Sequence, residues 1–238
     1  MQLFDESCIF YLCNPNKSST FARQKCGCYL SRMKIALIGY GKMGHMIEGI
    51  AKSRGHEIVC TIDLGDEDKF DSEAFKSADV AIEFTTPGTA ELNVRRAWAA
   101  GVPVVCGTTG WNAEALMAEP NTPGLVWKSN FSVGVNIFFD LNKWLAEKLR
   151  DYPQYAPHIY EEHHVHKLDK PSGTAKTLAE QIGGNVAIES VREGEIPGNH
   201  SVIWDSPEDT IVITHMAKGR EGFALGAVLA AEGLKIEN

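Results

Sequence analysis

The stretch GYGKMG at residues 39–44 decides the fold of this chain, because it joins a predicted strand to a predicted helix. An apolar run at residues 35–38 precedes it, and residues 43–53 follow with helical spacing. Three glycines in the order G-x-G-x-x-G permit a tight turn and let a pyrophosphate approach the first amides of a helix. An isolated glycine triplet would also fit a packing turn, but strand, loop and helix together predict a dinucleotide-binding site.

Short apolar runs alternate with helix-like stretches between residues 34 and 128. This alternation is typical of βαβ units around a parallel sheet, so we expect a Rossmann-like α/β domain. The predicted strands are 35–38, 57–62, 80–84, 102–106 and 125–128, with helices at 43–53 and 89–100.

The pattern changes after Asn130, where a long amphipathic helix is predicted at 135–149. It leads into a smaller α+β domain for substrate binding and oligomerisation, with strands at 159–162, 186–191, 201–204 and 210–215 and a helix at 174–182. A final helix of small residues at 222–234 could pack back on the first domain. We therefore expect residues 33–130 plus 217–238 to form the dinucleotide-binding domain and 131–216 the second domain.

The composition limits the classes of function. The chain has 238 residues, 44% hydrophobic and 23% charged, with a formal net charge of -8. An acidic chain is a poor general binder of nucleic acid or of an anionic membrane, because both present phosphate. Since no apolar run approaches a membrane span of roughly 18 residues, we expect a cytoplasmic protein.

Residues 1–32 follow neither helical nor strand periodicity and contain four of the six cysteines. A metal or disulfide role remains an alternative, although the spacing Cys26-Gly27-Cys28 is too tight for the usual zinc pattern. We expect a disordered N-terminal extension, with Met33 as the natural start.

Asp63 follows the second predicted strand, 24 positions after Gly39. An acidic residue near this position binds the adenosine ribose hydroxyls and repels a 2′-phosphate. Leu64 and Gly65 provide no arginine for that phosphate. The alternative is a solvated aspartate at the end of a strand.

Two turns, FTTP at 84–87 and CGTTG at 106–110, follow further predicted strands. The carboxyl ends of parallel strands are the ligand-binding rim of such sheets, so these turns are expected to line the nicotinamide half of the site. Each alone could be an ordinary turn of small residues.

The segment EEHHVHKLDKPSGTA at 161–175 is the richest in chemistry. Ser172 is a predicted helix N-cap, and the amides of Gly173 and Thr174 could then bind a substrate carboxylate, unless this is only an ordinary capped helix. In a continuous strand His163 and Lys167 would lie about 13 Å apart. We therefore expect a turn near Val165 that lets both reach one ligand.

A metal site is the alternative for this segment. His164 and His166 would share a strand face, and Glu161, Glu162 or Asp169 might complete a ligand set. Because no third ligand at a matching spacing appears elsewhere, we favour proton transfer by histidine and lysine and predict no metal.

From Met33 to the C-terminus the chain resembles the 4-hydroxy-tetrahydrodipicolinate reductase (dihydrodipicolinate reductase) family of diaminopimelate and lysine biosynthesis. The resemblance implies hydride transfer from nicotinamide to C4 of a cyclic imine dicarboxylate, giving tetrahydrodipicolinate. It also implies that His163 is the acid/base residue, Lys167 a proton donor, and His164, Gly173 and Thr174 carboxylate ligands. The motifs that carry it are KMG at 42–44, GTTG at 107–110, NFSVGVN at 130–136 and EHHVHKLDKPSGTA at 162–175.

Two features depart from well-known family members. The stretch Asp63-Leu64-Gly65 stands where dual-specificity members carry an arginine, which favours NADH over NADPH. The sequence between Asp63 and the strand at 80–84 is short, so a helix and perhaps a strand are expected to be reduced.

The resemblance also implies a homotetramer joined through the second domain. Val202, Trp204, Ile211 and Ile213 suit such an interface or the core of that domain equally well.

The prediction is therefore a nicotinamide-dependent oxidoreductase, with two rivals: an aspartate-dehydrogenase-like enzyme and a noncatalytic NAD-binding redox sensor. The predicted catalytic residues are His163 and Lys167, and the predicted substrate ligands are His164, Ser172, Gly173 and Thr174. The predicted cofactor contacts are Gly39, Tyr40, Gly41, Lys42, Met43, Gly44, Asp63, Phe84, Thr85, Gly107, Thr108, Thr109, Ser129, Asn130 and Phe131.

Overall fold

The computed structural model describes residues 32–236. The extension predicted over residues 1–32, with its four cysteines, lies outside this range apart from Arg32. Within the described range Cys60 and Cys106 are free thiols. None of the helices described is both long and apolar enough to cross a membrane.

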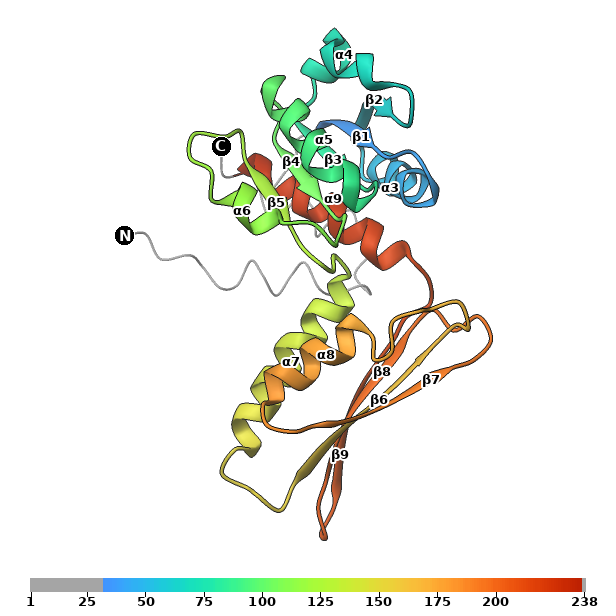
Figure 1. The fold of residues 1–238 in the computed structure, drawn as a ribbon, viewed down its shortest axis with the longest axis vertical. Coiled ribbons are helices and arrows are strands. Elements are labelled where there is room, and N and C mark those ends of the chain that lie inside the picture. Colours follow the sequence, from blue (N-terminus) through green and yellow to red (C-terminus); the bar gives the residue numbers. More distant parts are fainter. Residues whose placement is uncertain (1–31, 237–238) are drawn as a thin grey trace, which may run out of the picture. The chain divides into compact units, whose positions relative to one another are not determined.

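The first lobe is built on a parallel five-stranded sheet, sheet A (Figure 1). Its strand order is β2-β1-β3-β4-β5, so the chain moves from β1 first to one side and then to the other. This strand order confirms the predicted Rossmann-like class. In such doubly wound sheets, ligands bind where the strand order reverses. The strands are β1 (Lys34–Ile38), β2 (Glu57–Ile62), β3 (Val80–Glu83), β4 (Val104–Cys106) and β5 (Leu125–Trp127).

Helices cover both faces of sheet A, and the sequence predicted the longer ones. It missed three short elements that span barely one turn each, too little for periodicity to be detected. The longer helices are α3 (Lys42–Ser53), α5 (Pro87–Ala99) and α9 (Glu221–Ile236), and the short elements are η1 (Glu67–Asp71), α4 (Glu73–Lys76) and α6 (Ala113–Met117).

Alternation along β1 divides the core of the first lobe into two layers. Ile35 and Leu37 pack into one cluster with residues of α3 and α9, whereas Ala36 and Ile38 pack into the other with residues of α5. Successive side chains of a strand point to opposite faces, which is why one apolar run serves both layers.

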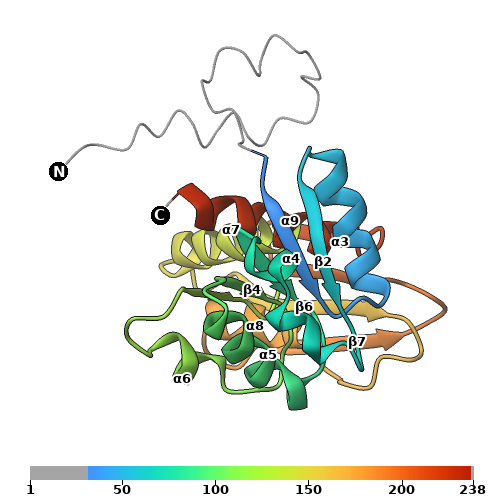
Figure 2. The ribbon, with the colours of Figure 1, turned by 90° about the horizontal axis from the view of Figure 1, so that it is seen from above.

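The C-terminal helix α9 packs back on the first lobe, as predicted. It lies beside α3 on one face of sheet A (Figure 2). Its Glu232 forms a two-pronged ion pair with Arg54 at 2.7 Å and lies 2.8 Å from His56 Nε2. A Cβ on Gly226 would lie 1.6 Å from the Phe131 carbonyl oxygen, so a small residue is required at this contact.

The second lobe is a mixed four-stranded sheet, sheet B, with strand order β7-β6-β8-β9. The β6 and β7 strands are parallel, with α8 between them in the chain, while β8 and β9 join as antiparallel strands. Two helices, which lie side by side in Figure 1, pack on one face of the sheet. The elements are β6 (Ala156–His163), β7 (Ala187–Arg192), β8 (Asn199–Asp205), β9 (Thr210–Met216), α7 (Val133–Leu149) and α8 (Gly173–Ile182).

The structure decides between core and interface for four side chains of sheet B. Val202 and Trp204 are buried, and Ile211 and Ile213 pack against the same cluster beneath α7 and α8. The interface reading of these four is therefore wrong, because alternation turns them toward the helices. The opposite face presents other apolar side chains, including Val212 at 53% and Met216 at 66% exposure.

Candidate functional site

The glycine turn between β1 and α3 has little room for side chains. Gly39 has φ +91°, and a Cβ there would lie 2.1 Å from the Phe84 carbonyl oxygen. A Cβ on Gly44 would lie 2.4 Å from the Gly39 oxygen. Both positions therefore require glycine for the turn itself.

Gly41 differs, because a Cβ there would meet no atom within 4 Å. It is the N-cap of α3, and no side chain caps the first amides of this helix. Unpaired amides at a helix N-terminus form an anion site, and space over Gly41 would let a pyrophosphate reach them. The turn thus fits the dinucleotide that the sequence predicts.

The other three residues of the turn have different surroundings. Tyr40 donates a hydrogen bond to Glu48 of α3, Lys42 is exposed, and Met43 packs against the core. Tyr40 is thereby fixed to the helix that follows it, whereas Lys42 is available to a phosphate.

The predicted contacts after β2, β3 and β4 lie at the same carboxyl edge of sheet A. Asp63 is exposed directly after β2. The Thr85 amide donates to Thr108 Oγ1 at 2.8 Å, which ties the turn after β3 to the turn after β4. A Cβ on Gly107 would lie 2.2 Å from the Phe84 ring, so these two turns also pack directly.

A buried carboxylate supports these two turns. Glu83, at the end of β3, accepts hydrogen bonds from Thr85 and from the Cys106 thiol, whose Sγ lies 2.9 Å away. Burial raises the pKa of Cys106, and the Glu83 charge raises it further, so this thiol remains protonated and donates.

The link between the lobes places three further predicted cofactor contacts. Ser129 and Asn130 face a pocket, whereas Phe131 is only 4% exposed and packs in the core under α9. The Phe131 side chain is therefore a support for the link in this arrangement, with its ring 6.2 Å from that of Phe84.

The pocket, of about 740 Å³, collects all six residues predicted to bind substrate or to catalyse. Of the predicted cofactor contacts, only Thr109, Ser129 and Asn130 line it, and the glycine turn does not. Its predicted lining residues are His163, His164, Lys167, Ser172, Gly173 and Thr174, to which the structure adds His200, His215, Arg220 and others.

The chain turns after β6, as the sequence analysis required. The Lys167 amide donates to the His164 carbonyl at 3.1 Å, so residues 164–167 form the turn expected near Val165. The Lys167 ammonium then pairs with Asp169 at 2.7 Å. Both His163 and Lys167 reach the pocket because the strand ends at His163 and the chain turns before Lys167.

Ser172 begins α8, as predicted. Its hydroxyl accepts from the Ala175 amide at 3.2 Å and lies 3.1 Å from His200 Nε2. The amides of Gly173 and Thr174 lie in the first turn of α8, where a helix has no carbonyl partner for them. Amides at this position of a helix can bind an anion, and both residues line the same pocket.

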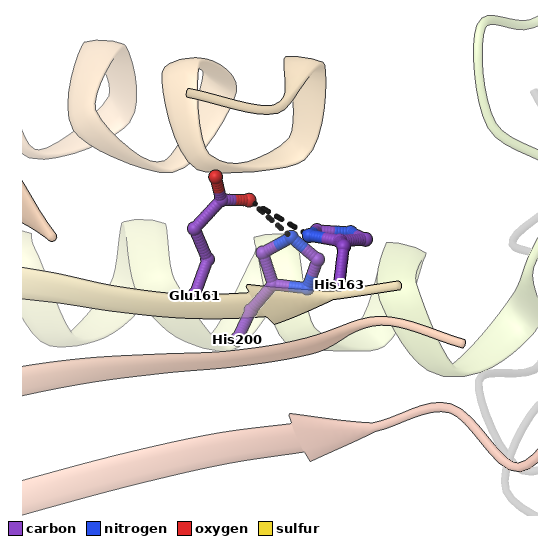
Figure 3. Close-up of side chains that lie close together, drawn as sticks. All are labelled: Glu161, His163 and His200. Carbon is purple, nitrogen blue, oxygen red and sulfur yellow. Dashed lines mark ion pairs between the residues drawn. The ribbon is translucent and has the colours of Figure 1, made fainter. Parts of the chain in front are cut away.

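His163 lies at the end of β6 beside a buried carboxylate (Figure 3). Its Nδ1 is 3.1 Å from Glu161 Oε2, and His200 Nε2 is 3.6 Å from the same oxygen. Burial lowers the pKa of His163, an effect that the Glu161 charge opposes. Burial and the neighbouring His163 lower the pKa of His200 to about 4.

The structure keeps only Glu161 of the residues that the sequence suggested for the metal alternative. His166 is exposed beside Glu195, and the possible ligand atoms that lie within 4.8 Å of one another belong to Glu161, His163 and His200. Glu161 already pairs with Arg192 at 3.1 Å, whose positive charge disfavours a cation there. The absence of a metal stays a prediction.

Two family models match almost all of the described chain. "Dihydrodipicolinate reductase, N-terminus" matches residues 33–131, and "Dihydrodipicolinate reductase, C-terminus" matches residues 134–238. The chain belongs to the dihydrodipicolinate reductase family. The resemblance seen in the sequence is therefore confirmed. Members of this family are oxidoreductases that use a nicotinamide cofactor.

Curated relatives cover most of the chain. A 4-hydroxy-tetrahydrodipicolinate reductase of Christiangramia forsetii is 44% identical over 85% of this chain and 92% of its own length. One of Methanoculleus marisnigri is 34% identical over 84% of this chain and 92% of its own length.

Solved structures share the fold of this chain. A dipicolinate-bound dihydrodipicolinate reductase of Paenisporosarcina sp. TG-14 has a TM-score of 0.65 at 19% identity, covering 86% of this chain and 95% of that one. An aspartate semialdehyde dehydrogenase II of Vibrio cholerae has a TM-score of 0.55 at 10% identity, covering 87% and 99%. At these identities the likeness supports the two-lobed fold alone.

The sequence did not predict four side chains at this site: His200, His215 and Arg220 line the pocket, and Arg192 pairs with Glu161. His200 lies directly opposite Glu161 in the β6–β8 pairing, and His215 lies opposite His200 in the β8–β9 pairing. Arg220 lines the pocket just before α9. Only the register of three strands brings the histidines together, and no local signal reveals that register.

Proposed function

We propose that this chain reduces 4-hydroxy-tetrahydrodipicolinate, by way of dihydrodipicolinate, to tetrahydrodipicolinate in diaminopimelate and lysine biosynthesis. One observation carries the proposal: a single pocket holds His163, Lys167 and the first two residues of α8, Gly173 and Thr174. An acid/base group, a cation and an anion site are what reduction of an imine dicarboxylate requires. The names of the relatives support the same reaction.

The pocket is suited to a dianionic substrate. The amides of Gly173 and Thr174 would bind one carboxylate, and His164 lies beside them in the same pocket. Arg220 lines the pocket and supplies a guanidinium, the side chain best shaped to bind a second carboxylate.

Proton transfer would fall to Lys167 as the donor and to neutral His163 as the base. When bound, reduced nicotinamide supplies a hydride, and the stoichiometry then requires one proton per turnover and releases one water from the hydroxylated substrate. Lys167 carries the proton toward the electron-rich enamine that conjugate addition leaves, and Asp169, 2.7 Å away, holds the ammonium in place. His163 provides the second titratable group within the same pocket.

The adenine side favours NADH. Asp63 is exposed at the end of β2 and would accept hydrogen bonds from ribose hydroxyls, while its charge would repel a 2′-phosphate. Leu64 is 95% exposed and Gly65 has no side chain, so neither neutralises that phosphate.

The lobes would divide the work as the sequence suggested. We infer that residues 33–130 with 217–238 bind the dinucleotide, and that 131–216 bind the substrate and join subunits. The open face of sheet B, where Val212 and Met216 are exposed, supports a homotetramer joined through that face. Light scattering should give four subunits, and a monomer at micromolar concentration would contradict this. A cytoplasmic location accompanies the proposed pathway.

The test supplies the purified chain with the product of the upstream synthase and records nicotinamide oxidation at 340 nm. Oxidation should depend on the synthase product, with a higher kcat/KM for NADH than for NADPH. No oxidation with either cofactor would reject the reaction, and retained NADH binding in that case would favour a redox sensor.

A further inference from the structure

Glu161 is a fully buried carboxylate that joins four parts of the second lobe (Figure 3). Its Oε1 accepts hydrogen bonds from the Ser172 amide and from Arg192, each at 3.1 Å. Its Oε2 lies 3.1 Å from His163 Nδ1 and 3.6 Å from His200 Nε2. One side chain thus contacts β6, β7, β8 and the start of α8.

The carboxylate is ionised despite its burial. Burial alone raises the pKa of Glu161, but hydrogen bonds from Ser172, Ser190 and Arg192 outweigh it and hold the pKa at about 2. An isolated buried charge is unfavourable, so Arg192 is needed to balance it. Glu161 is therefore a permanent negative charge directly behind His163.

We propose that Glu161 is a positioning residue for the reduction: it holds the proton of neutral His163 on Nδ1 and leaves Nε2 as the acid/base atom. Its contact with Ser172 also holds the start of α8 beside the substrate. Its contact with Arg192 holds the loop that carries Lys167. The proposal rests on the proposed function, because it assigns Glu161 a part in that reaction.

The charge of Glu161 and its distance from His163 Nδ1 favour one tautomer of the imidazole. An ionised carboxylate can only accept hydrogen bonds, so a neutral imidazole beside it donates from the nearer nitrogen. Within the described residues neither Glu161 Oε2 nor His163 Nδ1 has a hydrogen-bond partner. At 3.1 Å a small rotation closes a bond between them.

Arg192 links Glu161 to the backbone at Lys167. Arg192 pairs with Glu161 and also donates to the Lys167 carbonyl at 3.3 Å and to the Asp169 carbonyl at 2.5 Å. The backbone of the catalytic lysine is therefore anchored to the carboxylate that orients His163. Removing the charge of Glu161 would therefore loosen both the His163 ring and the backbone at Lys167.

The pH dependence of turnover would report this charge. Burial lowers the pKa of His163 and the Glu161 charge raises it, so neutralising Glu161 would lower the pKa of His163 further. The acid limb of kcat would then move to lower pH. The titratable and charged groups that face His163 are Glu161, Lys167, Asp169, Arg192 and His200.

The test compares Glu161→Gln with Glu162→Gln in the full chain. Glu162 follows on the same strand but points to the other face, where it accepts from Tyr160 and Asn199. We expect Glu161→Gln to lower kcat on the order of 10²-fold, to raise the KM for the dicarboxylate and to move the acid limb to lower pH, with the Kd for NADH unchanged. Glu162→Gln should stay within about twofold of wild type.

A folded Glu161→Gln variant with wild-type kcat and an unmoved pH profile would overturn the proposal. Should that variant fail to fold, nitrogen-15 NMR of the wild-type chain decides instead, independently of turnover. His163 should carry its neutral-state proton on Nδ1, and a proton on Nε2 would overturn the proposal. A wild-type chain that shows the Nδ1 tautomer but no turnover would sink the proposed function rather than the pairing.

Discussion

The glycine turn and the His163 pocket are built in opposite ways. The turn at 39–44 is built from consecutive residues, and it depends on atoms that are absent: Gly39 and Gly44 leave no room for a Cβ. The pocket depends on atoms that are present: side chains of β6 and β8 line it, and Arg192 of β7 lies behind them. These side chains contact partners about 30 residues away in sequence.

This difference predicts which kind of substitution would disrupt each region. The turn fails when a methyl group is added, because the backbone must adopt positive φ and a phosphate must come close. The pocket fails when a charge or a proton donor is removed, because its partners are buried and cannot turn to water instead. Substitutions in the two regions should therefore separate cofactor binding from turnover.

The largest expected effect belongs to the two catalytic side chains. His163→Ala and Lys167→Ala should each lower kcat by roughly 10²- to 10⁴-fold, since each removes a proton-transfer group. The Kd for NADH, measured by fluorescence titration, should not change. His166→Ala is the control, because His166 is exposed in the same turn. Wild-type turnover in either catalytic variant would place the chemistry elsewhere.

Next come three glycines that separate strain from binding. Gly39→Ala should lower the free energy of unfolding by about 2 kcal/mol or more, because φ is +91° and the added Cβ meets backbone. Gly41→Ala should leave stability within about 0.5 kcal/mol but raise the Kd for NADH roughly tenfold, since open space there would receive the pyrophosphate.

Gly49→Ala is the matched control on α3, where a Cβ would also meet nothing within 4 Å. It should keep wild-type affinity for NADH and stabilise the helix by a few tenths of a kcal/mol up to about 1 kcal/mol. Urea unfolding and NADH titration distinguish the three variants. Equal NADH affinity in the Gly41 and Gly49 variants would contradict phosphate binding at this turn.

A smaller effect is expected at the adenine side. Leu64→Arg should raise the ratio of kcat/KM for NADPH over NADH by about tenfold, because a guanidinium at this exposed position can pair with a 2′-phosphate. Leu92→Arg on α5 adds the same charge elsewhere and should leave the ratio unchanged. An unchanged ratio in both variants would show that the ribose lies away from β2.

The last prediction concerns acid stability. His200 stays neutral in the folded chain down to its pKa of about 4, whereas in the unfolded chain it takes up a proton below its ordinary value. The contribution of His200 to the free energy of unfolding is therefore fully present above the ordinary pKa of histidine and is lost as pH falls toward 4. This loss should be on the order of 2 kcal/mol. Urea unfolding at pH 7 and 4.5 should show a smaller loss in His200→Gln than in wild type or His166→Gln. Equal losses would contradict the burial of His200.

Much of this architecture could be predicted from the sequence because its signals are local. The strand, glycine turn and helix of the first lobe are consecutive, and Ser172 caps α8 three residues before the amide it binds. Arg192 and His200 could not be predicted as partners of Glu161, since only the β6–β7 and β6–β8 registers bring them together. Trp204 could not be assigned to core or interface, because strand alternation does not reveal which face is covered.

The most direct test of the account follows the hydride itself. The chain would be given the product of the upstream synthase with nicotinamide deuterated at its C4, and the reaction product would be analysed by NMR. The account predicts one deuterium at C4 of tetrahydrodipicolinate, with Lys167→Ala slowing its appearance and Gly49→Ala leaving it unchanged. Nicotinamide oxidation without deuterium in the product, or deuterium at another carbon, would contradict it.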